Sequence, residues 1–212
     1  MNYRAVLFDF DGVTADTPRL NYEGWHKAFT TVGVSIGVEE YYLLEGHGPH
    51  QIAALFCSRH GVDISKTDEM VRLKEAHVAT LGSPQFYPEI SVLLDTLHAC
   101  GVALGLVTGG ARARIENSLR ADFRNRYGVI VTSDDTQHHK PHPEPYLKAA
   151  AVLGVTPPQA LVIENAPLGI TSAKSGGFPC VALTTTLPAS MLAGADWILP
   201  DHAALLKWFA GD

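Results

Sequence analysis

Short apolar runs alternate with amphipathic segments along most of the chain. The apolar runs predict buried strands at Arg4–Asp9, Val102–Thr108, Gly128–Thr132, Ala160–Glu164 and Pro179–Leu183, with a weaker strand at Trp197–Leu199. Between the strands, apolar residues recur at helical spacing, as at Ile90, Leu93, Leu94 and Leu97, and at Tyr146, Ala150 and Leu153. This alternation predicts an α/β fold, a doubly wound parallel sheet with crossover helices.

The stretch from residue 16 to residue 86 breaks the alternation. It contains two apolar helical faces and no convincing buried strand; the faces are Tyr22, Trp25, Phe29 and Val32, and Ile52, Leu55 and Phe56. We therefore expect an α/β core domain formed by residues 1–15 and 87–212, and a helical domain formed by residues 16–86.

Composition and charge narrow the classes of partner. With 46% hydrophobic residues, the 212-residue chain can bury a sizeable core, and no apolar run approaches the roughly 20 residues of a membrane span. The net charge of −6, without a basic stripe, disfavours nucleic acid. The N-terminus lacks the pattern of a signal peptide. We expect a cytoplasmic monomer or weak dimer whose three cysteines (Cys57, Cys100 and Cys180) are reduced and buried.

Polar residues that can carry chemistry stand at or near the ends of the predicted strands. They are Asp9 and Asp11, then Thr108-Gly109-Gly110, then Lys140 in a proline-rich loop, and finally Glu164-Asn165. Two buried carboxylates need a compensating cation, and a hydroxyl followed by unobstructed backbone amides suits an anionic oxygen cluster. Each feature alone is ordinary, but their order along the chain is specific.

That order resembles the haloacid dehalogenase superfamily, in the branch of β-phosphoglucomutase- and phosphoglycolate-phosphatase-like enzymes. The four motifs are matched by Asp9-x-Asp11-Gly12-Val13, Thr108, Lys140-Pro141-x-Pro143 and Glu164-Asn165-Ala166-x-x-Gly169. The helical segment that follows the first motif looks like the cap of that branch. The resemblance covers nearly the whole chain and implies a Rossmann-like core.

The resemblance also implies a role for each motif residue. Asp9 would be the nucleophile, Asp11 the general acid and base, and Thr108, Gly109, Gly110 and Lys140 the groups that hold the phosphoryl group. Mg²⁺ would lie among Asp9, Asp11, Glu164 and Asn165. The implied activity is Mg²⁺-dependent hydrolysis of a small phosphorylated metabolite through an aspartyl-phosphate.

Asn165 departs from the pattern of the branch, which has a carboxylate at this position. Asn offers a neutral carbonyl oxygen, so the cation would be attracted less strongly. A phosphometabolite-binding protein with little turnover is therefore an alternative. The intact Asp9, Asp11, Thr108 and Lys140 favour an enzyme.

A sugar-phosphate mutase is the second alternative. By resemblance, mutases carry His, Lys and Arg in the cap where this chain has Asn21, Glu45 and Pro49. A carboxylate and a proline, as at Glu45 and Pro49, cannot bind a distal phosphate. Candidate substrate residues in the cap are Thr17, Asn21 and His47, and His47 and His50 are equally consistent with a solvated loop. A metal cluster of His138, His139 and His142 is a further, weaker hypothesis.

Overall fold

The computed structural model describes residues 3–211, which contain a six-stranded sheet with the order β5-β4-β1-β6-β7-β8. All five pairings in this sheet are parallel. The strands are β1 (Ala5–Phe8), β4 (Ala103–Val107), β5 (Val129–Val131), β6 (Ala160–Glu164), β7 (Cys180–Leu183) and β8 (Trp197–Leu199). The predicted Rossmann-like parallel sheet is confirmed. The strand order reverses at β1, and such a switch point is where α/β sheets bind ligands.

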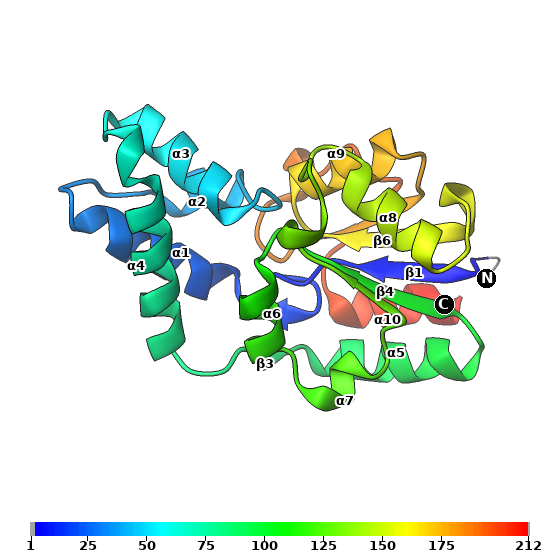
Figure 1. Cartoon of the computed structure of the whole chain (residues 1–212). Helices are drawn as coiled ribbons and strands as arrows, with labels where there is room; N and C mark the ends of the chain where they lie inside the picture. Colours follow the sequence, from blue (N-terminus) through cyan, green and yellow to red (C-terminus); the bar gives the residue numbers. More distant parts are fainter. Residues whose placement is uncertain (1–2, 212) are drawn as a thin grey trace.

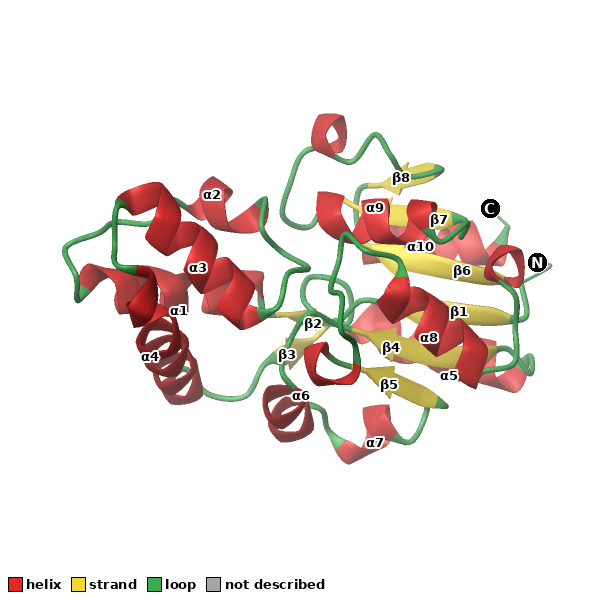
Figure 2. Cartoon of the chain, turned by 45° about the horizontal axis from the view of Figure 1, so that its top comes forward, coloured by secondary structure: helices red, strands yellow, loops and turns green. Residues whose placement is uncertain are grey.

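Helices cover both faces of the sheet (Figure 2). Along β1, Val6 and Phe8 join one apolar cluster and Ala5 and Leu7 join the other, which explains the continuous apolar run. The first cluster includes residues of α5 (Pro88–Ala99), α6 (Arg112–Ser118), α7 (Ala121–Arg124) and α10 (His202–Ala210). The second includes residues of α8 (Glu144–Val152) and α9 (Pro167–Ser175). Four short 3₁₀ helices complete the chain: Ile64–Lys66, Ser133–Asp135, Pro157–Gln159 and Ala189–Met191.

Four helices lie to one side of the sheet, at the left of Figure 1: α1 (Pro18–Thr30), α2 (Val38–Tyr42), α3 (Pro49–His60) and α4 (Thr67–Thr80). They pack around an apolar cluster of their own. In it, the ring of Phe56 lies 6.0 Å from that of Trp25 and 5.5 Å from that of Phe29. A separate core of this kind supports the proposal that residues 16–86 form a cap domain; we call α1 to α4 the helical segment.

A two-stranded antiparallel ladder joins the two ends of the helical segment. It pairs β2 (Ala15–Asp16) with β3 (Gln85–Phe86). The sequence did not predict these strands, because a run of two residues is too short to show a period of two. The chain therefore leaves the sheet and returns to it at neighbouring points.

The three cysteines are free thiols. Cys57 and Cys180 are buried, as predicted, but Cys100 is exposed and the prediction is wrong there. Cys100 caps the C-terminus of α5, beyond the face of that helix that packs on the sheet. Within residues 3–211, no helix has the length and apolar character needed to cross a membrane.

Candidate active site

The loop after β1 carries Asp9 and Asp11 at the switch point of the sheet. Asp9 is buried, and its backbone N–H continues the strand pairing by donating to the carbonyl of Ile163 at 3.0 Å. The chain turns at Gly12, which has a φ of +81°. The Thr14 hydroxyl then donates to the Asp9 carbonyl at 2.7 Å. This compact turn fixes both carboxylates at the end of the strand.

Lys140 lies between two carboxylates. Its Nζ is 2.6 Å from Asp9 Oδ1 and 2.6 Å from Glu164 Oε1, and the side chain is 1% exposed. Burial raises the pKa of Asp9, while the Lys140 ammonium opposes that rise. Burial alone would lower the pKa of Lys140, but the two carboxylates outweigh it and leave that pKa above its usual range. Lys140 is thus the compensating cation that the sequence analysis required.

Each oxygen of Glu164 accepts two hydrogen bonds. Oε1 accepts from Lys140 at 2.6 Å and from the Tyr146 hydroxyl at 2.7 Å. Oε2 accepts from the backbone N–H groups of Asn165 and Ala166 at 3.0 and 3.3 Å. A Cβ at position 169 would lie 1.7 Å from Glu164 Oε1, so only glycine fits there. This explains the Gly169 of the fourth motif in physical terms.

Asp11 has a different set of partners. The guanidinium of Arg114, on α6, donates to both of its oxygens, and the Thr17 hydroxyl and the Asn21 amide donate to Oδ1 at 2.5 and 2.9 Å. Burial favours a higher pKa for Asp11, but Arg114 and Thr17 outweigh it and the pKa is lowered. Thr17 and Asn21, two of the candidate substrate residues, therefore contact Asp11, the second carboxylate of the first motif.

The Thr108-Gly109-Gly110 turn packs against the loop between α2 and α3. A Cβ on Gly109 would lie 2.6 Å from the Gly46 carbonyl oxygen and 2.8 Å from that of His47. The hydroxyl of Thr108, which is 3% exposed, accepts from the Gly110 N–H at 3.0 Å. Glycine at position 109 thus allows the helical segment to approach the sheet closely.

The side-chain amide of Asn165 contacts Thr186 of the core and Glu45 of the helical segment. Its Nδ2 lies 3.2 Å from the Thr186 hydroxyl and 3.5 Å from Glu45 Oε2. Glu45 is buried, and its Oε1 has no hydrogen-bond partner within the described chain. Burial, together with Asp11 and Asp9, raises the pKa of Glu45 well above its usual range.

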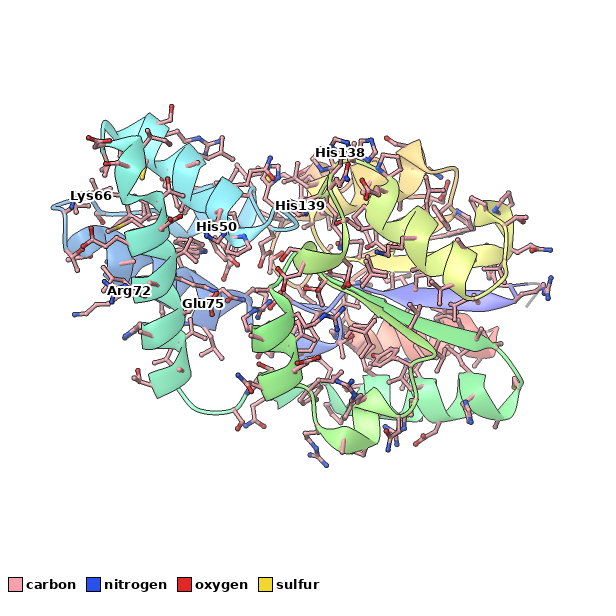
Figure 3. All side chains as sticks on the ribbon, in the orientation of Figure 1. His50, Lys66, Arg72, Glu75, His138 and His139 are labelled. Carbon is pink, nitrogen blue, oxygen red and sulfur yellow. The ribbon has the colours of Figure 1, made fainter. Side chains whose placement is uncertain are left out.

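A cavity of ≈ 40 Å³ between the sheet and the helical segment is lined by groups from both parts, including Asp9, Asp11, Glu45, Glu164, Asn165 and the Gly109-Gly110 turn. Glu75, labelled on α4 in Figure 3, reaches this cavity from the helical segment, and Arg114 reaches it from the core. A second cavity of ≈ 510 Å³, with Thr17, Asn21, Glu75 and Arg114 in its wall, lies beside the first. The first cavity holds little more than water, so a metabolite needs the helical segment to move.

The histidines singled out in the sequence occupy different places. His47 lines the first cavity, and its Nδ1 is buried without a partner in the described chain; burial lowers its pKa. His50 is exposed, with its Nε2 3.6 Å from Asp68 (Figure 3). The rings of His138 and His142 lie 4.6 Å apart. His139 instead packs on Gly48 of the helical segment.

A family model described as haloacid dehalogenase-like hydrolase matches residues 6–183. The chain belongs to this family. The predicted branch, with β-phosphoglucomutase- and phosphoglycolate-phosphatase-like enzymes, is confirmed, and so is a hydrolase acting on phosphate esters. The matched residues contain all four motifs.

Individual members of the family are similar over most of their length. The chain is 34% identical to validoxylamine A 7′-phosphate phosphatase from Streptomyces hygroscopicus subsp. limoneus over 208 residues, covering 94% of each chain. It is 39% identical to phosphoglycolate phosphatase from Salmonella paratyphi A, covering 86% of this chain and 82% of that protein. The crystal structure of CbbY from Rhodobacter sphaeroides in complex with phosphate has a TM-score of 0.82 at 28% identity and covers 96% of each chain.

The resemblance implies a Mg²⁺ ion, and the side chains of the site can be compared with what such a cation requires. Across residues 3–211, no three His, Cys, Asp or Glu side chains are already arranged around a metal position. Lys140 and Arg114 hold the carboxylates of Asp9, Glu164 and Asp11 instead. The donor set is nevertheless oxygen-rich, as Mg²⁺ requires, and it includes the unpartnered Oε1 of Glu45. The residues therefore fit a hard cation.

The sequence does not mark two residues of this site, Arg114 and Lys74, and it marks Glu45 in another role. Arg114 lies in the first turn of α6, after the Thr108-Gly109-Gly110 turn. Lys74, on α4, is 4% exposed and lines the cavity with its partner Glu75, 2.9 Å away. Glu45 was considered only as an obstacle to a second phosphate. For Lys74 the available signal was a lysine on a helical face that also carries Met70, Val71 and Val78; no comparable pattern marks Arg114.

Proposed function

We propose that this chain is a Mg²⁺-dependent phosphate monoester hydrolase that forms an aspartyl-phosphate on Asp9. The observation that carries the proposal is the arrangement around one cavity: Asp9 beside Lys140, Asp11 two residues later, and the Gly109-Gly110 backbone opposite. A nucleophile, a proton carrier and phosphate-binding groups are all within reach of one small group. Phosphoryl transfer depends mainly on such positioning.

In the proposed first step, an Asp9 oxygen attacks phosphorus and the bond to the leaving oxygen breaks. Lys140 holds Asp9 and offsets the negative charge of the equatorial phosphoryl oxygens. The hydroxyl of Thr108 and the backbone of Gly109 and Gly110 bind the same oxygens. Water then attacks the acyl phosphate, which restores Asp9 and releases inorganic phosphate.

Asp11 is proposed to donate a proton to the leaving oxygen and then to accept one from the attacking water. Its pKa is lowered by Arg114, so Asp11 must separate from Arg114 before it can carry a proton. Thr17 and Asn21, which also contact Asp11, would orient it through this exchange. Opening of the helical segment moves both of these residues relative to the sheet.

Asp9, Asp11, Glu164 and Asn165 would hold Mg²⁺. When bound, the cation supplies charge neutralisation for the nucleophile and the phosphoryl oxygens. The hydrogen bonds to Glu164 from Tyr146 and from two backbone N–H groups keep its carboxylate oriented toward this position.

The leaving group is proposed to occupy the second cavity, between the helical segment and α6. Its volume of ≈ 510 Å³ suits a small phosphorylated metabolite. The phosphatase relatives support a metabolite of this size. A mutase is disfavoured because Glu45, in the loop that would bind a second phosphate, brings a carboxylate into the cavity.

A phosphate-release screen over phosphorylated metabolites, with and without Mg²⁺, tests this proposal. We expect at least one monoester to be hydrolysed with Mg²⁺ and to be stable when the ion is chelated. Full activity in excess chelator would reject the Mg²⁺ requirement. Absence of release from every monoester tested, with tight binding of one of them, would favour the phosphometabolite-binding alternative.

A further inference from the structure

Glu45 is a buried carboxylate that the proposed reaction does not use. It lies in the loop between α2 and α3, is 5% exposed, and its Oε1 has no hydrogen-bond partner within the described chain. It lines the same cavity as Asp9, Asp11 and Glu164. A buried carboxylate without a partner is unfavourable in its ionised form, so it either takes up a proton or is reached by a cation. The surroundings of Glu45 decide between these two.

The charges around the cavity are not balanced. Four carboxylates line the cavity, and they are Asp9, Asp11, Glu45 and Glu164. Lys140 contacts Asp9 and Glu164, Arg114 contacts Asp11, and Lys74 is paired with Glu75. With all of these groups ionised, two negative charges lack a partner among the described residues. A divalent cation would remove this excess.

Glu45 is also next to the position where this chain departs from its family. Its Oε2 lies 3.5 Å from Nδ2 of Asn165. The family pattern has a carboxylate at position 165. A carboxylate at position 165 would face Glu45 and repel it, whereas the amide donates toward it. The neutral Asn165 and the charged Glu45 are therefore compatible as a pair.

We propose that Glu45 supplies, from the helical segment, the carboxylate that Asn165 lacks, and that it binds the divalent cation of the active site. The unpartnered Oε1, the excess negative charge and the adjacent Asn165 point to the same role. The inference rests on the proposed function for the position of the cation. Because Glu45 belongs to the helical segment and the other ligands to the sheet, cation binding draws the two together.

Mn²⁺ binding to the purified full chain, measured by the loss of the free-ion electron paramagnetic resonance signal, tests this inference without using activity. We expect Glu45→Gln to raise the Kd for Mn²⁺ about tenfold, because hard-cation affinity follows ligand charge. In the double variant Glu45→Gln/Asn165→Asp, the carboxylate returns to the sheet side, and we expect the Kd to recover to about that of the unmodified chain.

Glu39→Gln is the matched control, since Glu39 is an exposed residue six positions earlier on α2. It should leave the Kd unchanged, and thermal unfolding should show that every variant is folded. An unchanged Kd in Glu45→Gln overturns the inference. So does a double variant that binds as weakly as Glu45→Gln, because the charge would then not be interchangeable between the two positions.

A role in substrate recognition would give a different pattern. Glu45→Gln would then raise KM for the best phosphate ester and leave the Kd for Mn²⁺ unchanged, which overturns the cation assignment. The proposed function fails separately. In that case the Kd for Mn²⁺ would rise in Glu45→Gln and recover in the double variant, but the unmodified chain would release no phosphate from any monoester. The two failures are thus distinguishable.

Discussion

Arg114 holds both carboxylate oxygens of Asp11, with Nη1 3.0 Å from Oδ1 and Nη2 2.6 Å from Oδ2. The pair joins α6 to the loop after β1, and a bidentate pair of this kind is among the stronger charged contacts in proteins. It also keeps the proposed acid and base ionised. The arrangement described is therefore a closed resting form that must loosen before Asp11 can carry a proton.

The first prediction concerns the stability of this pair. Arg114→Met leaves Asp11 as a partly buried charge without its main partner, and we expect a loss of about 3 kcal/mol in the free energy of unfolding at pH 7. Asp11→Asn/Arg114→Met removes both charges and should recover most of that loss. Urea unfolding of the single and double variants measures both effects. Additive losses would show that the two side chains do not act as a pair.

The pH dependence of the same experiment has a definite sign. The pKa of Asp11 is lower in the folded state than its unfolded value of about 3.9, so its stabilisation is present above that value. It is lost as the pH falls through the folded-state pKa. The difference in unfolding free energy between the unmodified chain and Arg114→Met should therefore shrink below about pH 4. If the difference in unfolding free energy between the two proteins stays constant down to about pH 2, this prediction is contradicted.

The second prediction concerns the proposed nucleophile. Asp9→Asn keeps the size of the side chain but removes the charge that attacks phosphorus, and we expect turnover to fall by several orders of magnitude. Phosphate release under saturating substrate measures this. Because Lys140 loses a charged partner, circular dichroism should first establish that the variant is folded. Retention of full activity would reject Asp9 as the nucleophile.

The third prediction concerns the close contact between the sheet and the helical segment. Gly109→Ala would place a Cβ 2.6 Å from the Gly46 carbonyl oxygen, so the loop must shift away from the site. We expect kcat/KM to fall about tenfold or more, because small misplacements of reacting groups are costly. Gly37→Ala is the control, since its Cβ would meet nothing closer than Glu40 at 3.9 Å. Equal activity in both variants would contradict this.

The fourth prediction separates hydrolysis from isomerisation. With β-glucose 1-phosphate and a trace of the bisphosphate primer, we expect no rapid formation of glucose 6-phosphate. The physical reason is Glu45, which brings a carboxylate into the loop where a second phosphate would need a cation. A coupled assay for glucose 6-phosphate measures the outcome, and rapid product formation would show that this interpretation of the loop is wrong.

The fifth prediction concerns Asn165→Asp alone. In chelator, the new carboxylate faces Glu45 across the 3.5 Å contact, and we expect the melting temperature to fall by a few degrees. With Mg²⁺ present, the added ligand charge should give a larger thermal shift than in the unmodified chain and lower the Mg²⁺ concentration for half-maximal activity. Differential scanning fluorimetry over a Mg²⁺ titration decides it. Superimposable titrations would mean that residue 165 does not contact the ion.

The sequence predicted the sheet and three of the four motif positions because both depend on local pattern. Apolar runs bounded by polar residues define parallel strands, and the carboxyl ends of parallel strands meet at one edge. Asp9, Thr108 and Glu164 each follow directly from that rule. The position of Lys140 depended on the resemblance, since the loop before α8 has no periodic pattern to place it.

The contacts made across the two parts of the molecule could not be predicted in the same way. Arg112 and Arg114 are the same residue type and lie two positions apart, yet Arg112 binds Asp135 and Arg114 binds Asp11. Only the exact start of α6 decides which of them faces the cavity. The position of Glu45 depends on how the helical segment sits against the sheet, and no local sequence pattern records that orientation.

The short ladder between β2 and β3 affects how this fold can diversify. Because Ala15 pairs with Phe86 and Asp16 with Gln85, the chain between them begins and ends at hydrogen-bonded neighbours. An exchange, lengthening or rebuilding of that intervening stretch therefore places no strain on the strands that carry the motifs. Because Thr17, Asn21 and Glu45 lie within this stretch and contact Asp11 or Asn165, an exchange would change the surroundings of these motif residues together with the proposed leaving-group site. A chimera that joins a relative's segment at residues 16 and 85 is the natural unit for transferring specificity between members of the family.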